Sequence, residues 1–254
     1  MHGAVDPEET SQTRYRCRLE WGRQGARLAA LRRDVAVIVD TLRFSTAAIA
    51  AVEYGAILYP STDPADAAAL ARRLRADGRD GGAPEWQRRL SPAAYGAIEP
   101  GTRVIVLSPN GATCCQLARE APFVLVGALT NAAAVAEAVE RLLGEGPLGV
   151  TVVACGERRG QPGDDGPLRL AIEDYLGAGG ILSYLSLPRS PEAEVCEAAF
   201  RGVQDRLPDL LWNSVSGVEL RDKGLGEDVR YAAALNTSRA VPVLQGDYLE
   251  AFRL

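Results

Sequence analysis

Residues 40–46, with the sequence DTLRFST, place a carboxylate, an arginine and hydroxyl groups directly after an apolar run. A carboxylate at the end of a buried strand is costly unless a cation or amide donors lie nearby. A metal ion, Arg43 or the start of the following helix could satisfy Asp40, and the helix start would also attract an anionic ligand. Ser45 and Thr46 add hydroxyls. A plain helix cap is the alternative, because Asp, Ser and Thr all favour cap positions.

A second polar segment, SPNGAT at 108–113, also follows an apolar run. The pair Asn110-Gly111 permits positive φ, so consecutive amides could form an anion-binding nest. The segment lacks the spacing and the lysine of a Walker loop. An ordinary turn explains Asn-Gly equally well.

A third segment, CGERRG at 155–160, is followed by the acidic pair Glu173-Asp174. Arginines beside glycines could clamp a phosphate or a sulfonate, and a solvent-exposed charged loop is the alternative. Neighbours on a helix point about 100° apart, so the two acids should have different roles. One would bind a metal while the other orients an arginine or a helix end, unless both lie on a solvated helix face.

Together these segments describe a site for a small anion, with carboxylates for Mg²⁺ and with arginines and amides for phosphate oxygens. The only histidine is His2, in a polar N-terminal stretch. This count excludes a Ser-His-Asp triad, a Cys-His pair and a histidine-ligated zinc site. Magnesium fits because it prefers oxygen ligands.

Length and charge limit the class of protein. The 254 residues suit one large or two small domains, and the net charge of -5 gives no general attraction to nucleic acid or to an anionic membrane. No long apolar run or signal-peptide stretch occurs, so we expect a cytoplasmic protein. The five cysteines lack the spacing of a zinc site and favour reduced thiols. A reactive Cys155 is the alternative.

Strands and helices alternate along the chain, which predicts an α/β fold: a three-layer sandwich with a mainly parallel sheet and helices on both faces. The paired strand and helix ranges are 35–39 with 44–54, 103–107 with a helix from about 113, 123–126 with 131–143, and 150–154 with 170–187. Ligands of open parallel sheets bind beyond the carboxyl ends of the strands, where the three polar segments fall.

Further elements complete the prediction. They are helices at 63–76 and 192–207, helical pieces across 212–231, a loop at 78–84 and an edge strand at 241–244 interrupted by Pro242. We expect residues 1–30 to be a partly disordered N-terminal segment. Residues 31–254 should form a single α/β phosphatase-like domain, and a division into two subdomains is left open.

Five segments in order resemble the 2-phosphosulfolactate phosphatase family. They are VIVDTLRFST, LSPNGAT, LTNAAAVA, ACGERRG with AIEDYLGAGGIL, and KGLGEDVRYAAALNTSRAVPVL, and they span residues 35–244. The resemblance implies a Mg²⁺-dependent phosphatase that converts (2R)-2-phospho-3-sulfolactate to sulfolactate and phosphate, a step of coenzyme M biosynthesis. It departs from the family at 80–92, where a Gly-Glu-Arg segment and an aspartate are missing, and at Ala112, which separates Gly111 from Thr113.

The resemblance also implies roles for individual residues. The catalytic residues would be Asp40, Arg43 and Glu173, and the Mg²⁺ ligands Asp40, Glu173 and Asp174. The substrate would be bound by Thr46, Asn110, Gly111, Thr113, Glu157 and Arg158, the last two in place of the missing Glu-Arg pair. Asp228 also falls on a family motif.

Several alternatives stay open. The nucleophile is either metal-bound water or Asp40, and Leu42 favours water because it breaks the D-x-D pattern of haloacid-dehalogenase-type phosphatases. The protein could instead be a phosphatase for another small phosphorylated acid, a non-catalytic small-anion-binding or sensor protein of the same fold, or a redox protein. The expected partner is a small anionic substrate bearing phosphate or sulfonate, with no nucleic acid and no membrane, and a homodimer is left open.

Overall fold

The computed structural model describes residues 12–74, 90–144, 146–158 and 166–253. Its centre is an eight-stranded sheet in the order β1-β6-β2-β5-β9-β10-β3-β4. The strands are β1 (Cys17–Trp21), β2 (Val35–Val39), β3 (Ile57–Ser61), β4 (Arg103–Leu107), β5 (Phe123–Gly127), β6 (Val150–Ala154), β9 (Pro242–Gln245) and β10 (Tyr248–Ala251). A separate two-stranded sheet joins β7 (Glu157–Arg158) and β8 (Leu168–Arg169).

Two parallel groups of strands make up the large sheet. The first is β1-β6-β2-β5 and the second is β3-β4. The β9–β10 hairpin joins them through antiparallel pairings, Leu125 opposite Val243 on one side and Leu249 opposite Leu58 on the other. Three successive antiparallel steps mean that β3 and β4 run opposite to the first group.

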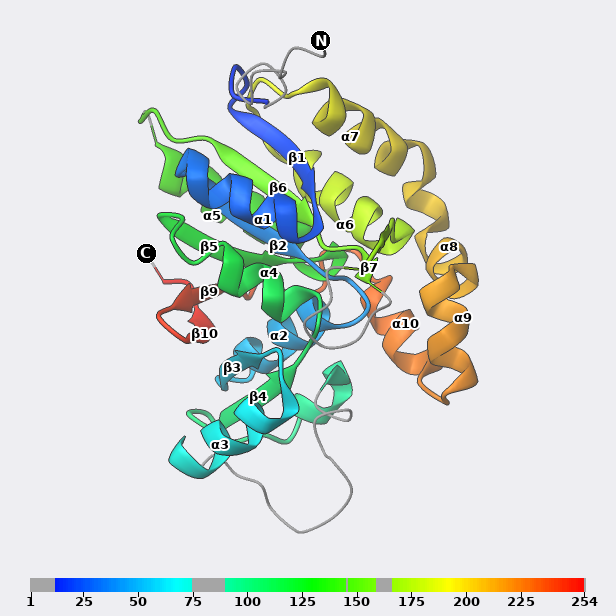
Figure 1. Ribbon diagram of the computed structural model, residues 1–254. Coiled ribbons are helices and arrows are strands. Elements are labelled where there is room, and N and C mark those ends of the chain that lie inside the picture. Colours follow the sequence, from blue (N-terminus) through cyan, green and yellow to red (C-terminus); the bar gives the residue numbers. More distant parts are fainter. Residues whose placement is uncertain (1–11, 75–89, 145, 159–165, 254) are drawn as a thin grey trace.

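Helices cover both faces of the sheet, which confirms the predicted three-layer α/β class (Figure 1). One face packs against α1 (Gly22–Arg32), α2 (Phe44–Glu53) and α4 (Gly111–Leu117), and the other against α5 (Ala132–Leu143), α6 (Ile172–Leu182) and α7 (Pro191–Val203). Strand β2 is buried on both sides: Ile38 points into the first layer of helices and Val37 into the second. A wholly apolar strand is expected for such a position.

The remaining helices lie at the periphery. Helix α3 (Pro64–Leu74) packs on β3 and β4 through Ala67, Tyr59 and Ile105. After α7, the chain continues through η4 (Gln204–Arg206), α8 (Leu207–Asn213), α9 (Val215–Asp222) and α10 (Gly226–Ala232). These C-terminal helices enclose a smaller core with Leu129 and Leu176, beside the end of the sheet where β7 lies (Figure 1).

Two predicted elements require correction. The predicted edge strand at 241–244 is β9, which lies inside the sheet, because the unpredicted strand β10 covers its other side. Its proline is tolerated at the first position, where no ladder hydrogen bond is lost in the middle of the strand. The predicted helix at 192–207 ends at Val203, and α8 starts with Pro208 in its first turn, because proline cannot continue a helix.

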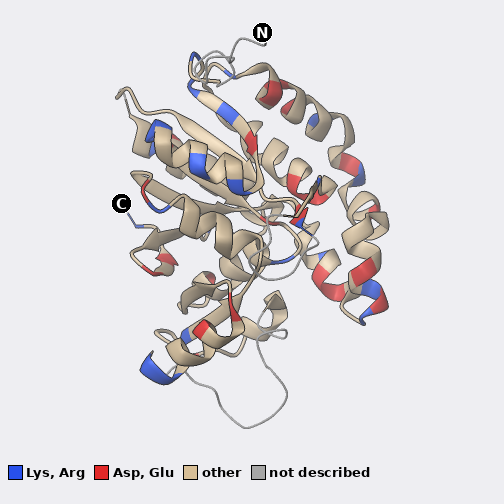
Figure 2. Ribbon diagram, in the orientation of Figure 1, with Lys and Arg blue, Asp and Glu red and all other residues tan. Residues whose placement is uncertain are grey.

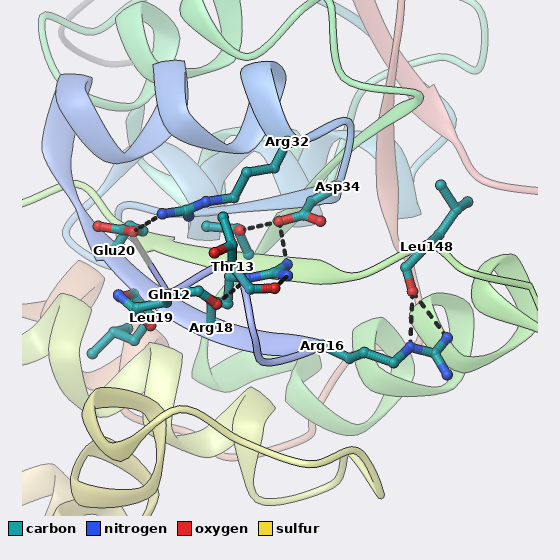
Figure 3. A network of polar contacts seen from close by, with 10 residues as sticks. Gln12, Thr13, Arg16, Arg18, Leu19, Glu20, Arg32, Asp34 and Leu148 are labelled. Carbon is teal, nitrogen blue, oxygen red and sulfur yellow. Dashed lines mark hydrogen bonds and ion pairs between the residues drawn. The ribbon is translucent and has the colours of Figure 1, made fainter. Parts of the chain in front are cut away.

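Strand β1 and helix α1 are not predicted from the sequence, although they cover much of segment 1–30. Residues 1–11 lie outside the described part of the chain. In β1, Arg18 donates to Asp34 at 2.6 Å and Glu20 accepts from Arg32 at 2.8 Å, so charged side chains form ion pairs at an edge of the sheet (Figure 3). These charges hide the apolar pattern of a strand. The predicted loop at 78–84 also lies outside the described residues.

Figure 2 shows arginines spread along α1 and acidic residues in the first turn of α6. No helix in the described part of the chain is long and apolar enough to cross a membrane.

Candidate active site

Asp40 follows β2 and is held by donors from two segments. Its Oδ2 accepts hydrogen bonds from the Gly111 amide at 2.9 Å and the Ser108 hydroxyl at 3.3 Å. Its Oδ1 accepts from the Phe44 amide at 3.3 Å. Asp40 is buried at 7% exposure. The first two polar segments therefore meet at one carboxylate, although β4 runs opposite to β2.

Asp174 joins the first and third segments. Its Oδ1 accepts a hydrogen bond from the Thr41 amide and its Oδ2 accepts one from the Gly156 amide, both at 2.8 Å. Gly156 has φ +63°, a left-handed conformation that glycine adopts without strain. Asp174 thus fixes the chain just after β2 and just after β6 with a single buried side chain.

Glu173 lies beside Asp174 on α6 but has different surroundings, as expected for neighbours on a helix. It is also buried, and its Oε2 has no hydrogen-bond partner within the described part of the chain. The hydroxyl of Thr41 is likewise buried without a described partner. Buried polar atoms normally have partners, so these two atoms are candidates to bind an ion, a water or a ligand.

The second and third segments are linked through Asn110 and Glu157. The Asn110 Nδ2 donates to the Glu157 Oε1 at 3.1 Å, which places the loop after β6 beside the start of α4. All three predicted polar segments therefore lie around one end of β2.

Arg43 is oriented from the C-terminal helices. Its NH1 donates to the Asp228 Oδ2 at 2.7 Å, and the Ser91 hydroxyl donates to the Asp228 Oδ1 at 2.6 Å. The side chains of Arg43 and Asp228 are 10% and 5% exposed, so this ion pair is buried. Neither Ser91 nor the pairing of Asp228 with Arg43 is predicted from the sequence.

Negative charge accumulates at the site. Burial raises the pKa of Asp40 to about 6, and the negative charge of Glu157 adds to this shift. The hydrogen bonds from the Gly111 and Phe44 amides lower the pKa and oppose it only in part. Burial together with Asp40 and Glu173 raises the pKa of Asp174 well above its ordinary value. Buried carboxylates that repel one another favour a bound cation or a shared proton.

Other predicted site residues have local partners. The Thr46 hydroxyl is buried and donates to the Thr41 carbonyl, and the Thr113 hydroxyl donates to the Pro109 carbonyl, both at 2.8 Å. Arg158 donates to the Gly166 carbonyl from strand β7. Their predicted roles in binding substrate stay predictions, and Arg159 lies outside the described residues.

Three further groups at the site have no role assigned from the sequence, although Ser45 is noted there as a hydroxyl of the first polar segment. The hydroxyl of Ser45 accepts from the Asp40 amide at 2.8 Å and so fixes the chain where β2 ends. Ser108 and the Gly156 amide contact the two aspartates directly. Each of these residues lies in a polar segment that follows a strand, but serine and glycine are also ordinary turn residues, so the signal is weak.

The cysteines give no support to a thiol mechanism. All five are buried and free. Burial raises the pKa of Cys115 and of Cys155 well above the ordinary value. A nucleophilic or redox-active cysteine needs the opposite shift.

Gly111 has no room for a side chain. A Cβ there would lie 2.3 Å from Phe44 Cδ1 and 2.8 Å from Asp40 Oδ2. We expect Gly111→Ala to move the Asp40 carboxylate and to lower the kcat/KM for the phosphate ester that the family resemblance implies by roughly 10- to 100-fold. Gly202→Ala is the matched control, because a Cβ at this helical glycine meets nothing within 4 Å. Equal steady-state kinetics for the two variants would contradict the prediction.

Comparison with known proteins gives one consistent result. The family model for 2-phosphosulpholactate phosphatase matches residues 25–247. A probable 2-phosphosulfolactate phosphatase of Deinococcus radiodurans is 32% identical over 223 residues, 83% of this chain and 88% of the relative. Another from Thermus thermophilus is 31% identical over 228 residues, 86% and 91%. The 2-phosphosulfolactate phosphatase of Methanocaldococcus jannaschii is 26% identical over 226 residues, 87% and 93%.

Proposed function

This chain belongs to the 2-phosphosulfolactate phosphatase family, and from that premise we propose that it hydrolyses 2-phospho-3-sulfolactate to sulfolactate and phosphate with the help of Mg²⁺. Family membership makes the chain an enzyme, a phosphoric monoester hydrolase. The observation that carries the proposal is the meeting of three polar segments around the carboxyl end of β2, through the Gly111–Asp40, Asp174 and Asn110–Glu157 hydrogen bonds.

The substrate carries phosphate, sulfonate and carboxylate groups, so the site must supply cations and amide donors. Arg43 is a buried cation three residues after Asp40, and its guanidinium keeps donors beyond the one given to Asp228. Arg158 and the side chain of Asn110 lie on the neighbouring loops. We infer that these groups orient the substrate and stabilise charge on the transferring phosphoryl group, the two effects that contribute most to enzymatic phosphoryl transfer.

The donor set fits Mg²⁺. In the described part of the chain, no three His, Cys, Asp or Glu side chains gather into a group that could hold a metal ion. Mg²⁺ commonly takes only one or two protein carboxylates and fills its shell with water and phosphate oxygens. The unpartnered Glu173 Oε2 and the buried Asp40 would supply those two.

Asp174 is also a predicted Mg²⁺ ligand, and this role stays a prediction. Each of its carboxylate oxygens already accepts a hydrogen bond from a backbone amide. A bound Mg²⁺ would neutralise charge on the phosphoryl oxygens and relieve the repulsion among the acids.

Hydrolysis breaks the P–O bond of the ester, transfers the phosphoryl group to water and returns a proton to the leaving hydroxyl. His2, in the polar N-terminal stretch, is the only histidine of the sequence, so we assign proton transfer to the carboxylates. Leu42 breaks the D-x-D pattern of haloacid-dehalogenase-type phosphatases, which supports water over Asp40 as the attacking group. Membership in coenzyme M biosynthesis, a cytoplasmic location and a homodimer stay predictions.

Phosphate release tests the proposal directly. With Mg²⁺ present, we expect the kcat/KM for 2-phospho-3-sulfolactate to exceed that for 2-phospholactate by at least about 10²-fold, because the analogue leaves the sulfonate-binding groups unpaired. Equal rates on both substrates would favour a phosphatase for another small acid. Binding seen as a thermal shift, with no phosphate released from any ester, would favour an anion-binding protein.

Metal removal is a separate test. We expect EDTA to reduce phosphate release by at least about 10³-fold and added Mg²⁺ to restore it, since the acids at the site lose the cation that neutralises them. Full activity in EDTA, after dialysis against chelator, would disprove the Mg²⁺ part of the proposal while leaving the substrate assignment intact.

A further inference from the structure

Asp228 lies where three segments distant in sequence meet. It belongs to α10, which packs against η2 (Pro92–Tyr95) and η3 (Leu129–Asn131). One carboxylate oxygen accepts a hydrogen bond from the Arg43 guanidinium, and the other accepts one from the Ser91 hydroxyl. Because both oxygens are in use and the residue is 4% exposed, Asp228 has a fixed orientation.

We propose that Asp228 is a positioning residue, which holds the guanidinium of Arg43 toward the anionic groups of the substrate. This inference rests on the proposed function of Arg43 as a substrate-binding group. Asp228 takes the NH1 group, so the other donors of the planar guanidinium remain for a phosphate or sulfonate, a geometry that arginine favours.

The charges around Asp40 give the reason for such a residue. Arg43 is three residues from Asp40, and Glu157 adds to the negative charge there. Without Asp228, the guanidinium would lose its fixed partner and with it the position from which it meets substrate. Ser91 fixes the second oxygen of Asp228, so the carboxylate cannot follow. Holding the arginine in advance removes the cost of ordering it when substrate binds.

A double-mutant cycle separates positioning from a purely structural role. We expect Asp228→Ala to lower the kcat/KM by about 10- to 100-fold, Arg43→Ala by more, and the double variant to be no worse than Arg43→Ala alone. Each variant is assayed on whichever phosphate ester the wild type hydrolyses. Glu227→Gln is the matched control, because this acid on the same helix is 81% exposed and pairs only with Arg230 among the described contacts.

Rescue by free guanidinium is the second measurement. In the Arg43→Ala variant, free guanidinium should bind beside Asp228 and restore part of the activity. In the double variant with Asp228→Ala, the guanidinium concentration needed for the same rescue should be at least about tenfold higher. A structural role would not change this concentration. Additive losses in the cycle, or equal rescue with and without Asp228, would overturn the proposal.

The same double-mutant cycle can be measured on the binding of inorganic phosphate. The affinity for phosphate is determined by calorimetry, with Mg²⁺ added to the protein. Non-additive losses of phosphate affinity would support the positioning role even if 2-phospho-3-sulfolactate proves to be the wrong substrate. Additive losses, or wild-type protein that binds no phosphate, would overturn it. Failure of the substrate assignment and failure of the Asp228 role are thereby distinguished.

Discussion

Asp40→Asn is expected to reduce the kcat/KM for phosphate release by at least about 10³-fold while leaving the fold intact. The amide has the size of the carboxylate but carries no charge for a cation. Its single oxygen can serve the Gly111 amide or the Phe44 amide, but not both. The stability cost should be small, because a pKa raised to about 6 means that burial already disfavours the ionised carboxyl.

Steady-state kinetics and a urea unfolding curve check both halves of this prediction. A variant that hydrolyses substrate as fast as wild type would show that the chemistry lies elsewhere. A variant that loses activity only because it unfolds would show a midpoint well below that of the wild type. Asp40→Glu makes a useful companion, since it keeps the charge but moves it by a methylene group.

The location of the candidate site can be predicted from the sequence because strong local signals agree. A carboxylate such as Asp40, directly after an apolar strand that is buried on both faces, has few explanations. The polar residues after β4 and β6 follow the same pattern. The rule that ligands bind beyond strand ends brings them together. The rule does not explain the place of the segment after β4, because β4 runs opposite to β2, yet Gly111 and Asp40 are in direct contact.

The contacts within the site do not follow from the sequence. Asp228 reaches Arg43 across 185 residues, and no local pattern indicates which acid pairs with which arginine. The different tasks of Glu173 and Asp174 can be expected from their helical spacing, but only the structure shows that Asp174 binds two backbone amides. Side-chain partners distant in sequence depend on packing that pattern rules do not capture.

Strand β1 is missed by the sequence-based prediction for a related reason. Arg18 and Glu20 alternate with Cys17 and Leu19, and such a sequence also fits an exposed segment. Its partners, Asp34 and Arg32, come later in the chain, so burial of the charges is visible only after folding. Charged residues that are paired inside a protein are rare enough to mislead a prediction from composition.

Substitution of Asp34 is the second change with a large expected effect, and this effect is on the stability of the fold. Its Oδ2 accepts hydrogen bonds from Arg18 (Figure 3) and from Thr151, each at 2.6 Å, and the side chains of Arg18 and Asp34 are 8% and 4% exposed. Asp34→Ala would leave a buried guanidinium without its counter-charge. We expect the free energy of unfolding to fall by about 3–5 kcal/mol, measured by urea denaturation.

The double variant Arg18→Met/Asp34→Leu provides the control, because replacing a whole buried ion pair by apolar side chains is often neutral. It should recover most of the stability that Asp34→Ala loses, and an unchanged unfolding midpoint for Asp34→Ala would contradict the prediction. The folded fraction of Asp34→Ala should keep its kcat/KM within about twofold, since Asp34 precedes β2 and Asp40 follows it. Two buried aspartates at opposite ends of one strand would then have separable tasks, stability at the amino end and chemistry at the carboxyl end.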